Sequence, residues 1–305
     1  MLPFPKFSFE APRRIEDALT LLAQPDAVPV AGGTDLLPSV KHRLFTPGTL
    51  VSLRQLTDLR QVETLPGGGI ALGSGLTLRE VQRHPLVRAG WPALADAAGT
   101  IATPIIQNMG TLGGNVMLDT RCLYYNQPEG WRAALGYCLK KDGLICHVAP
   151  KGQGCYAAHS ADTVPALWLY GAEIELASPA GTRRVAIRDL YDVDGRTWVK
   201  VRRGELLTRI LLPAAPGAVG HRKCRTRAAI DYGWLLIGVS RSDEGYRAVL
   251  SAIGPQPIEV SGSTIEALAE NAFKATQPLS THNLPPPYRK RMVRVEVRRA
   301  AEALR

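Results

Sequence analysis

The feature that most constrains the fold is a glycine-rich turn, Ala31-Gly32-Gly33-Thr34-Asp35, between two segments of opposite character. Residues 27–30 form a short apolar run typical of a buried strand. Residues 36–43 have the composition of a helix, with Thr34 or Asp35 as the expected cap. Glycines at a strand-to-helix turn let the backbone approach a phosphate, and the helix N-terminus adds N–H donors. The turn is not GxGxxG, so the Rossmann fingerprint does not apply, and a plain capped turn is the alternative.

A second glycine-rich loop favours a ligand site over a plain capped turn. It is Gln107-Asn108-Met109-Gly110-Thr111-Leu112-Gly113-Gly114-Asn115. Each loop pairs two glycines with a threonine and a further polar residue. Two such loops could hold the two ends of one extended dinucleotide, with amides, carbonyls and hydroxyls fixing its orientation. We therefore interpret the two loops as parts of one ligand site.

Outside these loops, strand-like and helix-like stretches alternate without an internal repeat. The first of them form a βαβ-like unit that ends near Asp58. The last part of the chain carries four successive strand-like stretches and then two helical ones, a pattern typical of an antiparallel sheet covered by helices. We predict an α+β fold in three parts, residues 1–58, 59–197 and 198–305. The expected strands are 27–30, 49–53, 61–64, 69–73, 173–177, 206–212, 222–227, 234–241 and 246–253, and the expected helices are 13–24, 36–43, 78–82, 91–101, 163–169, 264–275 and 288–304.

Charge and hydropathy narrow the class of protein. No apolar run approaches the roughly 18–20 residues that a membrane span requires, and the first residues lack the order of a secretory signal. We therefore expect a cytoplasmic protein that does not enter a membrane. The net charge is +10, but no aromatic pattern or binding module points to nucleic acid. The basic residues near the end are interpreted as a solvated helical face, with a docking surface for an acidic redox partner as the alternative. They are Arg289, Lys290, Arg291, Arg294, Arg298, Arg299 and Arg305.

Four of the five cysteines, Cys122, Cys138, Cys146 and Cys155, lie close together in the sequence. Their spacing lacks the CxxC pairs of zinc ribbons and small ferredoxins. An iron–sulfur cluster, a zinc ion, and free or disulfide-bonded cysteines all stay open on spacing alone. In a long cytosolic chain such clustering favours metal ligation, and glycines between the cysteines give the segment the bends to bring them together.

Taken together, Ala31–Asp35 and Gln107–Asn115 resemble the FAD-binding subunits and domains of the xanthine oxidase family, and the resemblance covers essentially the whole chain. It implies a two-part FAD-binding domain of the PCMH type, made of a βαβ lobe (residues 1–58) and a mixed-sheet lobe (59–197). A C-terminal domain of the CO dehydrogenase flavoprotein type (198–305) would follow.

The resemblance also implies the positions that contact FAD. Asp162 matches an aspartate near the ribityl chain, although the N-cap of the next helix is an equally good local interpretation. Lys223 matches a lysine near the isoalloxazine, where a cation favours the reduced, anionic ring; a surface lysine is the alternative. Carried over by position, the FAD contacts are Val30, Ala31, Gly32, Gly33, Thr34, Asp35, Leu36, Ile101, Gly110, Thr111, Gly114, Asn115, Asp162, Leu207 and Lys223.

The cysteine segment is more specific still. The stretches 119–127 (DTRCLYYNQ), 131–140 (WRAALGYCLK) and 146–150 (CHVAP) resemble the flavin subunits of 4-hydroxybenzoyl-CoA reductases. That resemblance implies an insert at about 120–160 in which Cys122, Cys138, Cys146 and Cys155 bind a [4Fe-4S] cluster. Four thiolates complete such a cluster, so His147 and His159 are interpreted as packing or surface residues.

The resemblance implies an electron-transfer subunit without catalytic residues of its own. Its partners would be a large molybdenum-binding subunit with molybdopterin and a small subunit with [2Fe-2S] clusters, in an (αβγ)2 assembly. Ferredoxin or a similar carrier would supply low-potential electrons, by way of [4Fe-4S] and FAD, for the reductive dehydroxylation of 4-hydroxybenzoyl-CoA to benzoyl-CoA. An oxidative molybdenum hydroxylase or aldehyde dehydrogenase with outward electron flow is the first alternative, and a zinc-stapled binding module without redox activity is the second.

Overall fold

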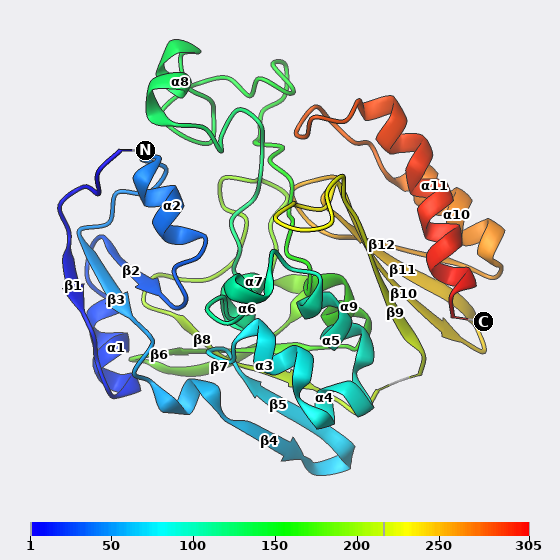
Figure 1. Ribbon diagram of the computed structural model, residues 1–305, viewed down its shortest axis with the longest axis horizontal. Coiled ribbons are helices and arrows are strands. Elements are labelled where there is room, and N and C mark those ends of the chain that lie inside the picture. Colours follow the sequence, from blue (N-terminus) through cyan, green and yellow to red (C-terminus); the bar gives the residue numbers. More distant parts are fainter. Residues whose placement is uncertain (1, 216, 305) are drawn as a thin grey trace.

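The computed structural model describes residues 2–215 and 217–304, which form three β-sheets with helices packed on them (Figure 1). The first sheet belongs to the N-terminal lobe, the second to the middle of the chain and the third to the C-terminal part. The predicted α+β fold is therefore confirmed. Within the described residues, no helix has both the length and the apolar composition needed to cross a bilayer.

The N-terminal lobe is a small parallel sheet with strand order β1-β3-β2. Helix α1 buries Ala18, Leu19 and Leu22 against it, because these residues recur at helical spacing and share one face. The predicted βαβ arrangement is confirmed, while the short, exposed strand β1 was not predicted. The elements are β1 (Ser8–Glu10), α1 (Ile15–Leu22), β2 (Ala27–Val30), α2 (Leu36–Lys41) and β3 (Thr49–Ser52).

The middle sheet has the strand order β4-β5-β8-β6-β7, and all of its pairings are antiparallel rather than mixed. Two hairpins, β4–β5 and β6–β7, flank β8, and a tight hairpin can join only antiparallel strands. The sequence places the stretch 206–212 in the last part of the chain, but β8 hydrogen-bonds to β5 and β6 and so belongs to this sheet. The strands are β4 (Val62–Leu65), β5 (Gly69–Gly73), β6 (Glu173–Ser178), β7 (Gly181–Ala186) and β8 (Leu206–Leu212).

Short helices cover this sheet and bury the largest core of the protein around Leu72, Leu94, Leu167 and Ile210. Their starts follow local chemistry: Thr77 and Glu80 form a capping box, and prolines begin several of the others. These helices are α3 (Leu78–Arg83), α4 (Pro85–Gly90), α5 (Pro92–Gly99), α6 (Pro104–Gln107), α7 (Leu112–Val116) and α9 (Val164–Leu169), with one-turn helices η1 (Thr57–Arg60), η2 (Pro66–Gly68) and η3 (Ile187–Asp189).

The C-terminal part is an antiparallel meander whose face is covered by two helices, as predicted, but its fourth strand is formed by residues 258–262, which were not predicted as a strand (Figure 1). Helix α11 is not simply a solvated basic face: Arg289 is fully buried, and Arg294 pairs with Glu270 at 2.7 Å. Arg305 lies outside the described residues. The elements are β9 (Val219–Cys224), β10 (Leu235–Ser242), β11 (Gly245–Ser251), β12 (Ile258–Gly262), α10 (Ile265–Ala275) and α11 (Pro286–Glu302).

The cysteine segment leaves and rejoins the fold at one place. Arg121 and Ala158 exchange two backbone hydrogen bonds of 2.8 and 2.7 Å, which closes the intervening chain into a single excursion. This segment contains one helix, α8 (Glu129–Ala134), and projects at the top of Figure 1. We call residues 121–158 the insert.

Candidate functional site

The first glycine loop connects β2 to α2, as the sequence predicts, and it touches the second loop backbone to backbone. A Cβ atom on Gly32 would lie 1.8 Å from the carbonyl oxygen of Met109. Gly33 has a φ of +68°, in the left-handed region that favours glycine. Only glycine therefore permits this contact, and the two loops meet as one shared ligand site requires.

The second glycine loop opens helix α7. Thr111 is its N-cap, and its hydroxyl accepts a bond of 3.1 Å from the Gly114 amide. A Cβ on Gly114 would have only the Thr111 hydroxyl within 4 Å, at 3.0 Å. Asn115 uses its side-chain oxygen to accept from the backbone and hydroxyl of Thr163, at 3.1 and 2.7 Å. The loop thus presents a bare backbone at Gly114 beside residues that are fixed by their own bonds.

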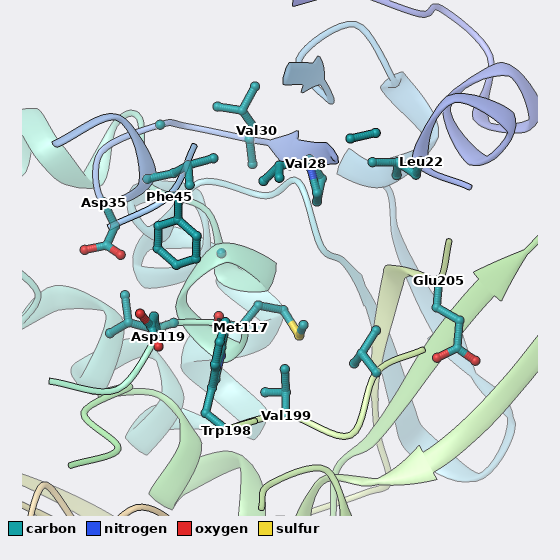
Figure 2. Close-up of a pocket in the computed structure, with 18 of the residues that line it drawn as sticks. Leu22, Val28, Val30, Asp35, Phe45, Met117, Asp119, Trp198, Val199 and Glu205 are labelled. Carbon is teal, nitrogen blue, oxygen red and sulfur yellow. Dashed lines mark hydrogen bonds between the residues drawn. The ribbon is translucent and has the colours of Figure 1, made fainter. Parts of the chain in front are cut away.

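A cavity of about 450 Å³ lies along the first loop, and we call it the loop cavity. In Figure 2, Leu22 and Val28 lie along one side of it, whereas Met117, Trp198 and Val199 lie opposite. Most of its lining is apolar, with polar groups at the loop, at Asp119 and at residues 202–205, as is typical of ligand pockets. The predicted contacts that line it are Val30, Ala31, Gly32, Gly33, Thr34, Asp35, Leu36 and Gly114.

A second cavity of about 240 Å³ adjoins the first, and Thr34, Asp35, Gly114 and Leu118 line both. We call it the ion-pair cavity. The two cavities therefore lie next to each other, with residues of both glycine loops in their walls. The predicted contacts that line the second cavity are Thr34, Asp35, Ile101, Gly114, Asn115, Asp162 and Lys223.

Asp162 and Lys223 form a buried ion pair in this second cavity. The Lys223 ammonium lies 2.6 Å from the Asp162 carboxylate, and the two side chains are 3% and 5% exposed. Burial raises the pKa of Asp162, while the charges of Lys223 and Arg225 act in the opposite direction. The alternatives drawn from the sequence do not hold: Thr163 occupies the N-cap position of α9, and Lys223 is not a surface residue. The pair places a fixed cation and a carboxylate at the cavity wall.

Asp35 stands at the N-cap position of α2, but its side chain makes no capping bond. Its carboxylate pairs instead with the Arg121 guanidinium and accepts a bond of 3.2 Å from the Tyr232 hydroxyl. The Arg121 guanidinium also lies 4.6 Å from the centre of the Tyr232 ring. Asp35 thus links the first loop to the start of the insert and to the chain between β9 and β10, which no local sequence signal indicates.

Three predicted contacts do not line either cavity. Gly110 lies behind the first loop, where a Cβ would be 3.4 Å from the Thr34 hydroxyl, and Thr111 is occupied in capping α7. Leu207 is buried in strand β8 within the main core. Gly110 and Thr111 can support the site from behind, whereas Leu207 is separated from it.

The insert brings its four cysteines together. Cys122, Cys138, Cys146 and Cys155 all line one small apolar cavity of about 10 Å³, which we call the thiol cavity. None of these thiols is in a disulfide. His147 also lines this cavity, with its ring stacked on Tyr124 at 5.0 Å and its Nε2 atom 2.5 Å from the Tyr137 carbonyl.

Burial, with a smaller contribution from neighbouring cysteines, raises the pKa of Cys122 to about 12 and that of Cys155 to about 11. These two thiols are therefore protonated near neutral pH in the absence of a ligand. Binding a metal would therefore release protons. Across residues 2–215 and 217–304, no group of three or more His, Cys, Asp or Glu side chains is arranged to hold a single metal ion.

His159 does not line the thiol cavity. It is fully buried, with its Nδ1 atom 2.7 Å from the Ser251 hydroxyl and its ring 4.4 Å from that of Tyr191. Burial lowers its pKa to about 3. The interpretation of His159 as a packing residue is confirmed.

Comparison with known proteins places this geometry in a family. The family model described as "FAD binding domain in molybdopterin dehydrogenase" matches residues 5–215. The aldehyde oxidoreductase FAD-binding subunit PaoB of Escherichia coli is 29% identical over 282 residues, covering 86% of this chain and 88% of that protein. The carbon monoxide dehydrogenase medium chain of Afipia carboxidovorans is 29% identical over 316 residues, covering 97% and 96%.

A solved structure agrees with these sequence matches. The reconstituted CO dehydrogenase from Oligotropha carboxidovorans has a chain that superposes with a TM-score of 0.79 at 26% identity, covering 99% of both chains. The predicted family is confirmed at this level: the chain belongs to the FAD-binding domains of molybdopterin dehydrogenases.

Proposed function

We propose that this chain is the FAD-carrying, electron-transferring subunit of a molybdenum-containing oxidoreductase complex. The observation that carries the proposal is the meeting of the two glycine loops beside two adjoining cavities. Family membership supports it, as do relatives named as FAD-binding subunits or medium chains of such enzymes.

The residues present fit FAD. The exposed backbone of the first loop and of Gly114 can approach a diphosphate without a side chain in the way, and the apolar walls of the loop cavity suit an adenosine. We assign the isoalloxazine to the ion-pair cavity, where the Lys223 ammonium favours an electron-rich ring. When bound, FAD accepts and passes on electrons.

The names of the relatives favour outward electron flow. They include an aldehyde oxidoreductase, a carbon monoxide dehydrogenase and a xanthine dehydrogenase, all of which take electrons from their substrates. We therefore favour an oxidative complex over the reductive dehydroxylation of 4-hydroxybenzoyl-CoA. The reductive reaction is the second candidate, and the insert with its four converging thiols is the observation that favours it.

We further propose that Cys122, Cys138, Cys146 and Cys155 hold a [4Fe-4S] cluster. Support comes from four thiols around one apolar cavity, the donor set that such a cluster requires. A single zinc ion is less suited to this arrangement, because no three side chains are placed around one ion among the residues described. Since the cavity measures only about 10 Å³, we expect the thiols to move apart on binding, which the irregular backbone of the insert permits.

The partners follow from the same proposal. We expect a large subunit with molybdopterin and a small subunit with [2Fe-2S] clusters, because a flavin subunit alone has no site for substrate chemistry. Two copies of this trimer, (αβγ)2, and ferredoxin or a similar carrier remain part of the proposal.

The test is the cofactor content of the protein purified without oxygen. We expect FAD, iron and acid-labile sulfide in the wild type. Cys138→Ser should lose iron and sulfide but keep FAD, because the flavin cavities lie outside the thiol cavity. Cys224→Ser is the matched control, since Cys224 is equally buried but lies in strand β9. Protein without FAD would refute the flavin proposal, and unchanged iron in Cys138→Ser would refute the cluster ligand.

Electron direction is tested separately, on the assembled complex. Reduction of the bound flavin on mixing with an aldehyde or a purine supports the oxidative reaction. Flavin reoxidation by 4-hydroxybenzoyl-CoA after prior reduction with dithionite supports the reductive one.

A further inference from the structure

The side chain of Lys140 lies between the thiol cavity and the loop cavity. It lines the thiol cavity, and its ammonium lies 2.6 Å from the carboxylate of Asp119, which lines the loop cavity. The ammonium also contacts the Thr120 hydroxyl at 2.7 Å and the Gly195 carbonyl. These three partners therefore hold the Lys140 ammonium in a fixed position between the thiol cavity and the loop cavity.

Two aromatic rings enclose the same ammonium. Its nitrogen lies 4.8 Å from the centre of the Tyr125 ring and 4.9 Å from that of the Trp198 ring. Tyr125 lines the thiol cavity and Trp198 lines the loop cavity (Figure 2). The Tyr125 hydroxyl donates a bond of 2.7 Å to Asp119, so the cation, the acid and both rings form one packed unit.

Water is largely excluded from this ion pair. The side chains of Lys140 and Asp119 are 4% and 8% exposed, and charges shielded from water act over longer distances than those at the surface. Of the two residues, Lys140 lines the thiol cavity and Asp119 lines the loop cavity.

We propose that Lys140 raises the reduction potential of a cluster in the thiol cavity. Its positive charge makes the cluster easier to reduce, and the negative charge of Asp119 opposes this effect. The inference rests on the proposed cluster and flavin. Reduction adds negative charge to a cluster, so a buried cation beside it stabilises the reduced form, and nearby charge sets cluster potentials. The placement of Lys140 at the thiol cavity thus favours the reduced form of the cluster.

The decisive measurement is the midpoint potential of the cluster, from an EPR-monitored titration of the purified complex. In Lys140→Met we expect the oxidised-to-reduced ratio at a fixed potential to rise about tenfold, a fall of about 59 mV for a one-electron couple. Lys141→Met is the matched control, because Lys141 is the next residue, pairs with Asp142 at 3.2 Å and does not line the thiol cavity. Its potential should stay at the wild-type value.

A purely structural role would not give shifts of opposite sign, so Asp119→Asn supplies the second arm. Removing that carboxylate while Lys140 remains should raise the cluster potential, and Lys140→Arg, which keeps the charge, should stay close to wild type. If Lys140→Met does not fold, these two variants decide the question.

The outcomes separate the two proposals. A wild-type protein without iron and sulfide overturns the proposed cluster and this inference with it. A wild-type cluster whose potential is the same in Lys140→Met, or in Asp119→Asn, overturns the role of the ion pair and leaves the cluster in place.

Discussion

The two candidate cofactor regions are built in different ways. The flavin cavities lie where regular elements end: β2 and α2 carry the first loop, α7 carries the second, and β9 supplies Lys223. The thiol cavity lies in the insert, whose only helix is α8. The fold itself therefore shapes the flavin site, whereas the insert depends on specific contacts to keep its shape.

Those contacts are mostly charges that reach from the insert to the rest of the fold. Arg121 pairs with Asp35, and Lys140 pairs with Asp119. The Arg132 guanidinium donates bonds of 2.9 and 3.2 Å to the carbonyls of His42 and Arg43. Asp35 and Asp119 line the loop cavity, and the two carbonyls belong to the chain that follows α2. The insert is thus attached to the flavin site by side chains, which predicts that the two regions respond differently to substitution.

The largest effect is expected where the two glycine loops touch. In Gly32→Ala, the new Cβ would meet the Met109 carbonyl oxygen at 1.8 Å, so one loop must move away from the other. We expect FAD binding to weaken at least a hundredfold, roughly 2.8 kcal/mol, as measured by the flavin retained after gel filtration. The iron content should not change, because Gly32 does not line the thiol cavity.

Gly130→Ala is the control for this prediction. Gly130 lies in α8 and has no heavy atom within 4 Å of the position of its Cβ, so the variant should keep its FAD. Wild-type flavin retention in Gly32→Ala would show that the loops separate without cost, and the contrast between a rigid flavin site and an adaptable insert would fail.

The sequence predicts those parts of the structure that are specified by local signals. Strand β2, the first loop and helix α2 were predicted because an apolar run, two glycines and a helical stretch are local signals. Strand β7 was missed because it is an edge strand with no buried residue and with two arginines, which lacks the apolar alternation of a half-buried strand. The signals that were read correctly are all carried by neighbouring residues.

The parts of the site that sequence could not supply depend on residues far apart in the chain. Arg121 and Asp35 are separated by 86 positions, and Trp198 reaches the loop cavity from the segment before β8. The cluster of cysteines indicated where the thiols lie, but not that Lys140 joins them to Asp119. Only the folded chain brings these residues together, from the N-terminal lobe, the insert and the segment before β8.

An intermediate effect is expected for Arg132, which tests whether side chains hold the insert. It is 1% exposed, and Arg132→Met would leave the carbonyls of His42, Arg43 and Gln127 without this donor. We expect a loss of about 2 kcal/mol in the free energy of unfolding of the insert, seen as faster proteolysis there. Lys151→Met, at an exposed position of the insert, should be cleaved at the wild-type rate, and equal rates for both variants would contradict the proposed anchoring.

The smallest effect concerns His159, just beyond the backbone bridge that closes the insert. Its pKa is lowered to about 3 by burial, from 6.5, so between these values the unfolded chain binds a proton that the folded chain does not. The free energy of unfolding should therefore fall as the pH drops below about 6.5, with His159 contributing about 1.4 kcal/mol per pH unit near pH 5. Urea titrations of His159→Gln should show a shallower pH dependence than the wild type by that amount. Equal slopes would mean that His159 takes up a proton while the protein stays folded, so its side chain would be open to water at the junction of the insert with the core.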